Sequence, residues 1–143
     1  MSRVINTANP GKKRNQARRT IAEMLRHLMF KKRIDEESKD MAALVTLSLR
    51  EIADTIEVTT AAWETRDYFL KADRFRLEWE WVGAAVQQLE RLIVGGRWDD
   101  LPGELVSLAP RFADIRIAKM TRGPETWQGA LQALLEEHAT EPG

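Results

Sequence analysis

Cysteine is absent from this chain of 143 residues, which excludes disulfide bonds, cysteine-ligated metals and thiol nucleophiles. Histidine is scarce, and neither of the two histidines completes the Glu-x-x-His spacing of di-iron helical bundles. No serine has a nearby histidine or other base in the pattern of a nucleophilic set. We therefore predict no catalytic residues, no metal ligands and no cofactor, and a protein that is not an enzyme.

Long hydrophobic runs are missing as well. No stretch approaches the length of a membrane span, and the N-terminal sequence MSRVINTANPGKKR lacks the apolar run of a secretory signal. The chain is 43% hydrophobic and 31% charged, which are values of a globular protein and not of a disordered one. We expect a cytoplasmic protein that has no contact with a membrane.

Apolar residues recur every three or four positions along most of the chain, which is the spacing of one helix face. This pattern predicts five helices, at about 12–33, 35–57, 61–94, 104–119 and 124–140. Asp35 is expected to cap the second helix, and Gly95-Gly96 to end the third, which is the longest. The junction between these two helices is either a separation or a bend.

No alternating pattern typical of strands competes with the helical one. We therefore predict an all-α fold, with a flexible tail over residues 1–11 and one helical domain over residues 12–143. The domain would be a four- to five-helix bundle built around the long, aromatic-rich third helix.

Positive charge is concentrated at the start of the chain, although the net charge is zero. Ten of the 22 Lys and Arg residues lie within residues 1–34, together with only one of the 22 acidic residues. A seven-residue repeat aligns four of these cations in a row beside the apolar stripe, an arrangement that suits phosphate groups. The predicted nucleic-acid contacts are Lys12, Lys13, Arg14, Arg18, Arg19, Arg26 and Arg33. An acidic protein surface and the acidic body of the chain itself remain open as other partners.

The third predicted helix is apolar on two sides. One stripe runs from Trp63 to Leu92, and the other includes Tyr68, Phe75 and Trp79. Such a helix is either central to its bundle or presents one side to a partner. Burial in the core is the more common outcome for large apolar side chains. The alternative is a homo-oligomeric or hetero-complex interface formed by Tyr68, Phe75 and Trp79, since aromatic residues are enriched where partners bind.

Two acidic segments carry a short resemblance. Glu36-Glu37-Ser-Lys-Asp40 and Glu51-Ile-Ala-Asp54 resemble the EExxD and ExxD segments of the all-α nucleotide pyrophosphohydrolases of the MazG type. The resemblance implies that Glu37, Asp40, Glu51 and Asp54 hold Mg²⁺ for the hydrolysis of nucleoside triphosphates. Convergence on one metal requires the two segments to lie on different helices. Here both fall within one predicted helix, about 16 Å apart along its axis.

The sequence as a whole favours a helical interaction module. Nucleic acid, bound without sequence specificity by the basic first helix, is the first hypothesis, because phosphate contacts require only a row of cations. A homo-oligomeric or hetero-complex scaffold that uses the aromatic helix is the alternative. An all-α, Mg²⁺-dependent nucleotide pyrophosphohydrolase is the third hypothesis.

Overall fold

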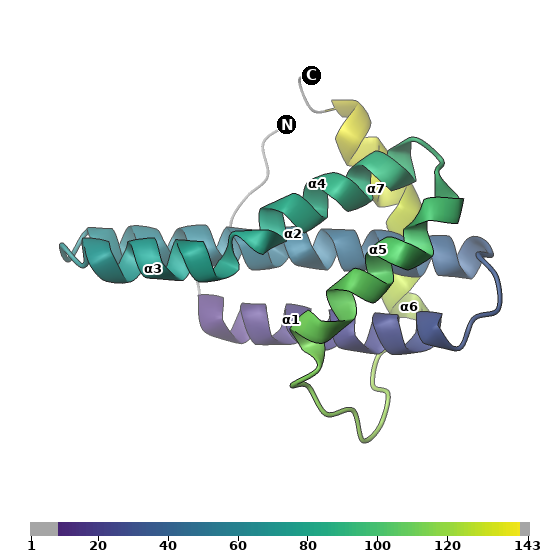
Figure 1. Cartoon of the computed structure of the whole chain (residues 1–143), viewed down its shortest axis with the longest axis horizontal. Coiled ribbons are helices and arrows are strands. Elements are labelled where there is room, and N and C mark those ends of the chain that lie inside the picture. The colour runs from purple at the N-terminus through teal and green to yellow at the C-terminus, as the bar shows by residue number, and fades with distance from the viewer. Residues whose placement is uncertain (1–8, 141–143) are drawn as a thin grey trace.

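The computed structural model describes residues 9–140, and these residues form an all-α fold, as predicted (Figure 1). The α-helices in chain order are α1 (Pro10–Met29), α2 (Glu36–Glu64), α3 (Phe69–Trp79), α4 (Trp81–Val94), α5 (Leu101–Leu108), α6 (Pro124–Trp127) and α7 (Ala130–Thr140). Two 3₁₀ turns, η1 (Trp98–Asp100) and η2 (Ala109–Phe112), flank α5. Most of the predicted tail lies outside the described residues, and α1 begins at Pro10. Within the described part of the chain, no helix is long and apolar enough to cross a membrane.

The longest of these helices is α2, with 29 residues, and it takes the central place that the sequence assigned to the third helix. It begins at Asp35, the predicted N-cap, which accepts a 2.8 Å hydrogen bond from the backbone N–H of Ser38. This hydrogen bond is the main reason why the pKa of Asp35 lies well below its usual value. Around α2 pack α1, α3, α4, α6 and α7.

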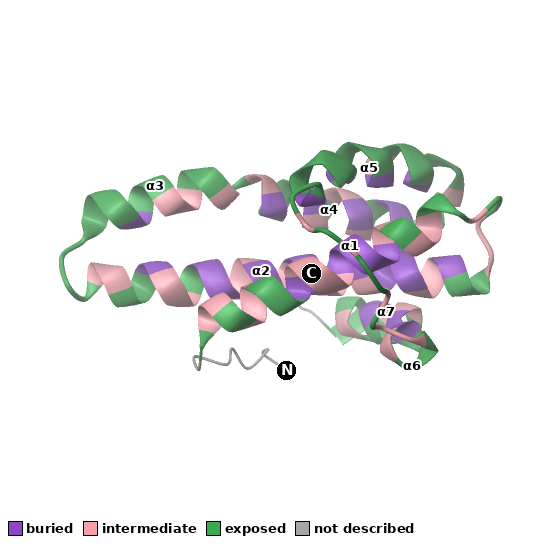
Figure 2. Cartoon of the chain, turned by 90° about the horizontal axis from the view of Figure 1, so that it is seen from below, coloured by how far each residue is buried: buried purple, intermediate pink, exposed green. Residues whose placement is uncertain are grey.

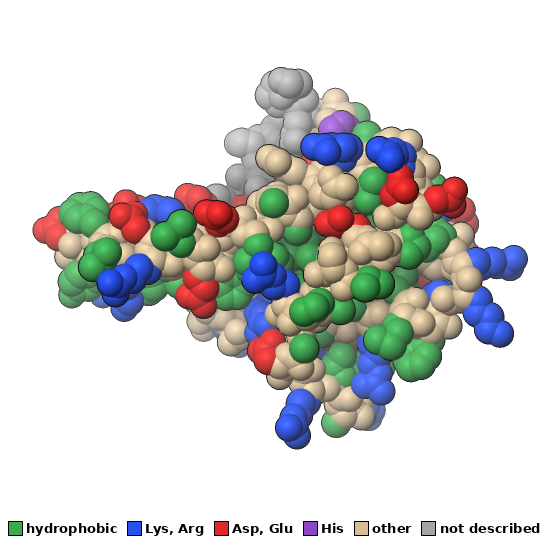
Figure 3. Space-filling model, viewed as in Figure 1, with side chains coloured by type: hydrophobic (Ala, Val, Ile, Leu, Met, Phe, Trp, Pro, Cys, Tyr) green, Lys and Arg blue, Asp and Glu red, His purple; other side chains and the backbone are tan. Residues whose placement is uncertain are grey.

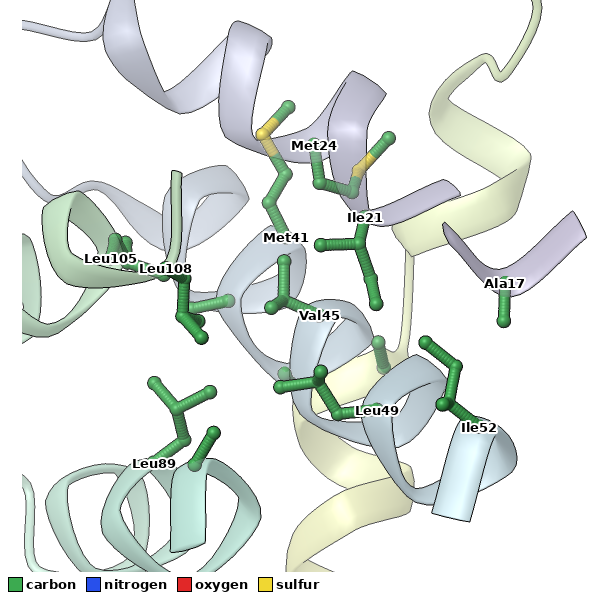
Figure 4. Packing of buried hydrophobic residues seen from close by; sticks show 14 of the residues in the cluster. Ala17, Ile21, Met24, Met41, Val45, Leu49, Ile52, Leu89, Leu105 and Leu108 are labelled. Atoms are coloured by element: carbon green, nitrogen blue, oxygen red, sulfur yellow. The ribbon is translucent and has the colours of Figure 1, made fainter. Parts of the chain in front are cut away.

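The hydrophobic core lies around α2 and contains buried residues of α1, α4, α5, α6 and α7, part of which Figure 4 shows. Apolar side chains at helical spacing on these elements point toward one another and are almost completely buried. The residues labelled in the close view are Ala17, Ile21, Met24, Met41, Val45, Leu49, Ile52, Leu89, Leu105 and Leu108. Burial of this apolar surface holds the helices of the body together.

The third helix predicted over 61–94 is wrong, because the chain reverses after α2 and forms two helices, α3 and α4. The turn is a Schellman motif, with hydrogen bonds from Asp67 N–H to Glu64 C=O (3.0 Å) and from Tyr68 N–H to Trp63 C=O (2.9 Å). Asp67 adopts the left-handed conformation that this motif requires, with φ 63°. Glycine is the usual residue there, so the familiar sequence signal for the turn is missing.

The fourth helix also ends earlier than predicted. Helical structure stops at Phe112, the end of η2, and residues 113–123 form neither helix nor strand. Pro110 in η2 has no N–H to continue a helical hydrogen-bond pattern. The fifth predicted helix is divided into α6 and α7 by a turn at Gly129, where φ is 82°.

The molecule has a body and a projecting arm (Figure 1). The arm is the helical hairpin of residues 57–79, in which α3 packs along the last part of α2 and extends beyond the other helices. Buried residues are concentrated in the body, whereas most of α3 is exposed (Figure 2). Ala72 is the fully buried residue of α3.

Candidate functional site

Four of the seven cations predicted to contact nucleic acid are hydrogen-bonded within the chain, and Arg14 is the first. It donates to the hydroxyl oxygens of Thr55 (3.1 Å) and Thr59 (2.9 Å) on α2. Its guanidinium also lies 5.0 Å from the ring centroid of Phe75 and 5.8 Å from that of Trp79, in cation–π geometry. Arg14 therefore ties the start of α1 to the base of the arm.

Arg18 holds the chain just after η2. It donates to the two carboxylate oxygens of Asp114, at 3.0 and 2.7 Å, and to the backbone carbonyl of Arg111 at 3.0 Å. The hydrogen bonding from Arg18 lowers the pKa of Asp114. The Arg18 guanidinium also lies 5.6 Å from the ring centroid of Phe112.

Arg19 and Arg26 continue the same arrangement along α1. Arg19 donates to the backbone carbonyls of Arg116 (3.2 Å) and Lys119 (2.8 Å), and Arg26 donates to the carbonyl of Ile117 (2.7 Å). Residues 113–123 have no helical hydrogen bonds of their own, and their carbonyls need partners. The arginines of α1 supply these partners, so much of the basic row serves the chain itself.

Glu23 completes this contact from a fully buried position on α1. Its carboxylate accepts hydrogen bonds from the Arg19 side chain (2.7 Å), from the backbone N–H of Thr121 (2.7 Å) and from the backbone N–H of Arg122 (2.9 Å). Burial by itself raises the pKa of Glu23, but these hydrogen bonds outweigh burial and lower the pKa to about 2. The single acidic residue of the basic region is thus the anchor for the far end of the 113–123 segment.

The other predicted cations remain available. The side chains of Lys12, Lys13 and Arg33 make no hydrogen bond or ion pair with another residue of the described chain. The exposed side chains of Arg116 and Lys119 lie on the segment that α1 holds, so their charges join those of the helix. Figure 3 shows several of the Lys and Arg side chains around the edge of the body.

The carboxylates of the two acidic segments do not form a metal site. They lie on α2, which runs without a break from Glu36 to Glu64. Glu37 pairs with Lys31 at 2.6 Å, and Asp40 accepts a 3.0 Å hydrogen bond from the backbone N–H of Leu131 near the start of α7. Among residues 9–140, no group of three or more His, Asp or Glu side chains is placed to hold a metal ion.

The inner side of the arm is aromatic. Trp63 and Phe75 pack edge to face with ring centroids 5.1 Å apart, and Phe75 lies 6.2 Å from Trp79. Trp79 in turn stacks on Trp81 at 6.1 Å, where α3 gives way to α4. Phe75 and Trp79, two of the three residues predicted to contact a partner, therefore pack against their own chain and are half-buried. The third, Tyr68, is 51% exposed at the tip.

The outer side of the arm carries the exposed apolar residues. Leu70 is 63% exposed and Leu77 is 69% exposed, and Phe69 beside the tip is 53% exposed. A seven-residue spacing places Leu70 and Leu77 on one face of α3, opposite the buried Ala72. Charged residues of both signs separate these apolar side chains along the surface of the arm (Figure 3).

The alternative predicted from sequence was an interface at Tyr68, Phe75 and Trp79, whereas the exposed face of α3 carries Leu70 and Leu77. Their spacing shows from sequence that the two leucines share a face. Whether that face is covered depends on where the chain reverses, and this turn was not predictable from a glycine or a proline. The fold and this surface define an all-α protein with a projecting helical arm. Comparisons with protein-family models, with curated proteins and with solved structures give no match.

Proposed function

We propose that this chain is a protein–protein interaction module that docks through its arm. The observation that supports the proposal most directly is the exposure of Leu70 and Leu77 on the outer face of a helix that extends beyond the body. Burial of one leucine side chain contributes roughly 2 kcal/mol, so a partner that covers both gains substantially. The proposal keeps the cytoplasmic location expected from the sequence.

The construction of the arm favours this role. Its inner aromatic contacts and the Arg14 cation–π contact hold α3 firmly against α2 and α1, so a partner would meet a preformed surface. Exposed apolar side chains rimmed by charge are typical of interaction sites. The core of the body lies elsewhere, so changes on the outer face of α3 can be tested without unfolding the chain.

Quantitative affinity purification of the tagged chain from the cells that express it tests this proposal. The test variant is Leu70→Ser/Leu77→Ser, and the matched control is Val106→Ser, which alters an equally exposed apolar residue on α5. We expect a protein that co-purifies in stoichiometric amount with the wild type and the control but is depleted at least about tenfold with the test variant. Identical sets of co-purifying proteins for all three chains, together with no self-association that depends on Leu70 and Leu77, would overturn the proposal.

A second candidate function is polyanion binding by the cations that have no internal partner. Arg19 and Arg26 hold the 113–123 segment beside α1, which adds the exposed Arg116 and Lys119 to the charge of Lys12. Clustered cations bind phosphate backbones without reading sequence, and such binding weakens steeply with salt. This surface supports nucleic acid as a partner independently of the arm.

The choice of variants decides whether that second test is informative. Replacing Arg19 or Arg26 removes a charge and also releases the 113–123 segment, so loss of binding would have two causes. The better variant is Lys12→Gln/Arg116→Gln/Lys119→Gln, because these three side chains form no hydrogen bond or ion pair with another residue among residues 9–140. Fluorescence anisotropy with labelled DNA and RNA should show binding at low salt that this variant loses. Equal binding by the variant, or none by the wild type at low salt, would eliminate this function.

A further inference from the structure

We propose that the partner of the arm is a second copy of this chain, bound through α3 in an antiparallel pair. The inference rests on the proposed function, because it names the partner of the same surface. It depends on the order of residues along the outer face of α3, where Leu70, Asp73, Arg74 and Leu77 follow one another. This order is self-complementary about its own centre.

A two-fold axis that passes between Asp73 and Arg74, perpendicular to α3, generates the pair. Each leucine lies about 5 Å from this axis along the helix, on opposite sides. The axis therefore places Leu70 of one copy against Leu77 of the other, and the same contact occurs twice. All four exposed leucine side chains become covered by one another, as expected for an isologous interface.

The charges agree with the same axis. Asp73 of one copy faces Arg74 of the other, which gives two symmetric ion pairs at the centre. Asp73 is 70% exposed, with only a 3.5 Å contact to Arg76 of its own helix. The Arg74 side chain has no hydrogen bond or ion pair among the described residues. Asp73 of one copy and Arg74 of the other thus attract each other only when the helices run antiparallel, since a parallel pair places like charges together.

The ends of the arm also find complementary groups. The axis brings Asp67 at the tip of one arm to the level of Glu80 and Trp81 at the base of the other α3. There the exposed Arg111 guanidinium lies 4.8 Å from the ring centroid of Trp81, and a hollow of about 510 Å³ opens beside it. The paired hairpins then form a row of four helices, with the two α3 helices at the centre and each outer face buried between them.

The paired surface is small, because α3 has 11 residues. Stable dimers bury far larger areas, so we expect a dissociation constant in the micromolar range. Sedimentation velocity of the purified full chain over a wide range of concentration measures this association. We expect a monomer–dimer equilibrium in the wild type and monomer at every concentration in Leu70→Ser/Leu77→Ser.

Charge exchange tests the central ion pairs. Asp73→Arg and Arg74→Asp each place like charges across the axis, and each should weaken dimerisation by at least about tenfold. A mixture of these two variants restores opposite charges at both contacts and should form a heterodimer nearly as tight as the wild-type dimer. Asp99→Arg, an equivalent change on exposed η1, is the control and should have no effect. Circular dichroism of each variant checks that the helices are retained.

The absence of cysteine allows a direct test of orientation. A mixture of Leu70→Cys chains and Leu77→Cys chains should form an intermolecular disulfide under mild oxidation. Neither variant alone should do so, because two copies of the same position lie about 10 Å apart along the helix pair. Disulfides between identical chains in each variant alone, and none that join the two variants in the mixture, would overturn the antiparallel pair.

These outcomes separate the self-pairing from the broader function. A wild type that is monomeric at all concentrations overturns the self-pairing, and so does a dimer that survives both the leucine and the charge changes. In either case a co-purifying protein that depends on Leu70 and Leu77 would still support an arm that docks on another protein. Absence of both results removes the arm from consideration as an interface.

Discussion

Helices α1 and α3 both combine arginines with large apolar side chains, yet they place them in opposite ways. In α1, the apolar residues Ile21 and Met24 are fully buried, and arginines such as Arg19 are hydrogen-bonded to the chain. In α3, Leu70 and Leu77 are exposed, and the neighbouring Arg74 has no partner among the described residues. A basic helix thus turns out to be largely self-satisfied, whereas a mixed helix exposes its apolar side.

The difference follows from what covers each helix. Helix α1 is covered by α2 on one side and by the 113–123 segment on another, so its side chains find partners in the body. Helix α3 packs mainly on α2, and α1 contacts only its base, through Arg14 (Figure 1). Charge or hydrophobicity in a sequence therefore does not identify a binding surface until the neighbours of the helix are known.

Removal of the buried carboxylate of α1 should have the largest effect. Glu23→Gln deprives Arg19, Thr121 and Arg122 of a charged acceptor, and we expect the free energy of unfolding to fall by about 3 kcal/mol. Urea denaturation followed by circular dichroism measures this loss. Glu125→Gln, a change at an exposed carboxylate on α6, is the control. Equal stability of Glu23→Gln and the wild type would show that the segment is held by other contacts.

Acid provides a second measurement of the same contact. The ordinary pKa of glutamate is 4.5, whereas the folded chain keeps Glu23 charged down to a pKa of about 2. A lowered pKa means that the stabilisation is present above pH 4.5 and is lost as the pH falls toward 2. The stability difference between the wild type and Glu23→Gln should therefore narrow over this range. A difference that stays constant would contradict the role of the charge.

The next largest loss of stability is expected for Arg19, and Lys12 of the same basic row provides the contrast. Arg19→Ala removes hydrogen bonds to Glu23, Arg116 and Lys119, and should cost about 2 kcal/mol of stability. Lys12→Ala, seven residues earlier, removes an exposed side chain that has no partner among residues 9–140, and should change stability by less than about 0.5 kcal/mol. Thermal unfolding of the two variants measures the contrast. Similar losses in both would mean that the row acts only through its summed charge.

Much of the body was predictable from sequence, because its signals are local. The apolar stripes of α1 and α2 and the N-cap Asp35 have the spacing and residue types that their elements require. The 113–123 segment was not predictable, since its backbone is held by side chains about a hundred positions earlier in the sequence, Arg19 and Glu23 among them. No local pattern reports such contacts.

The candidate interface was only partly predictable. The sequence marked the aromatic helix and gave Tyr68, Phe75 and Trp79 as an alternative to burial in the core. The chain reversal that exposes Leu70 and Leu77 depends on a non-glycine residue in the left-handed conformation. Asp67 and Gly96 occupy the same position of the same Schellman motif, at φ 63° and 67°. Glycine at position 96 predicted the end of its helix from sequence, whereas aspartate at position 67 gave no such signal.

Substitution of these two turn residues should change the free energy of unfolding by a smaller amount, and in opposite directions at the two sites. Asp67→Gly relieves left-handed strain and should raise the free energy of unfolding by about 0.5 kcal/mol. Gly96→Ala should lower it by about 1 kcal/mol, and through strain alone, because a Cβ there meets no atom within 4 Å. Urea denaturation of both variants tests the assignment. Destabilisation by Asp67→Gly would show that its side chain, and not its backbone, makes the turn.

The smallest effect on the single chain is expected at the outer face of the arm. Leu77→Ser alters a side chain that is 69% exposed, so at low protein concentration stability should change by less than about 0.5 kcal/mol. Leu89→Ala, at a fully buried position, should cost about 3 kcal/mol in the same measurement. Comparable losses at both positions would mean that the arm is folded against the body and offers no surface.

The dependence of stability on protein concentration tests the proposed dimer. Association stabilises the folded chain by mass action, so the midpoint of thermal unfolding should rise with concentration in the wild type. It should not rise in Leu77→Ser, because that variant loses the contact with Leu70 of the second copy. The wild type and Leu77→Ser should therefore have the same midpoint of thermal unfolding at low concentration. Their midpoints should differ increasingly as the concentration rises. Leu77, which contributes little to the stability of the single chain, would then stabilise the folded state through its contact with Leu70 of a second copy.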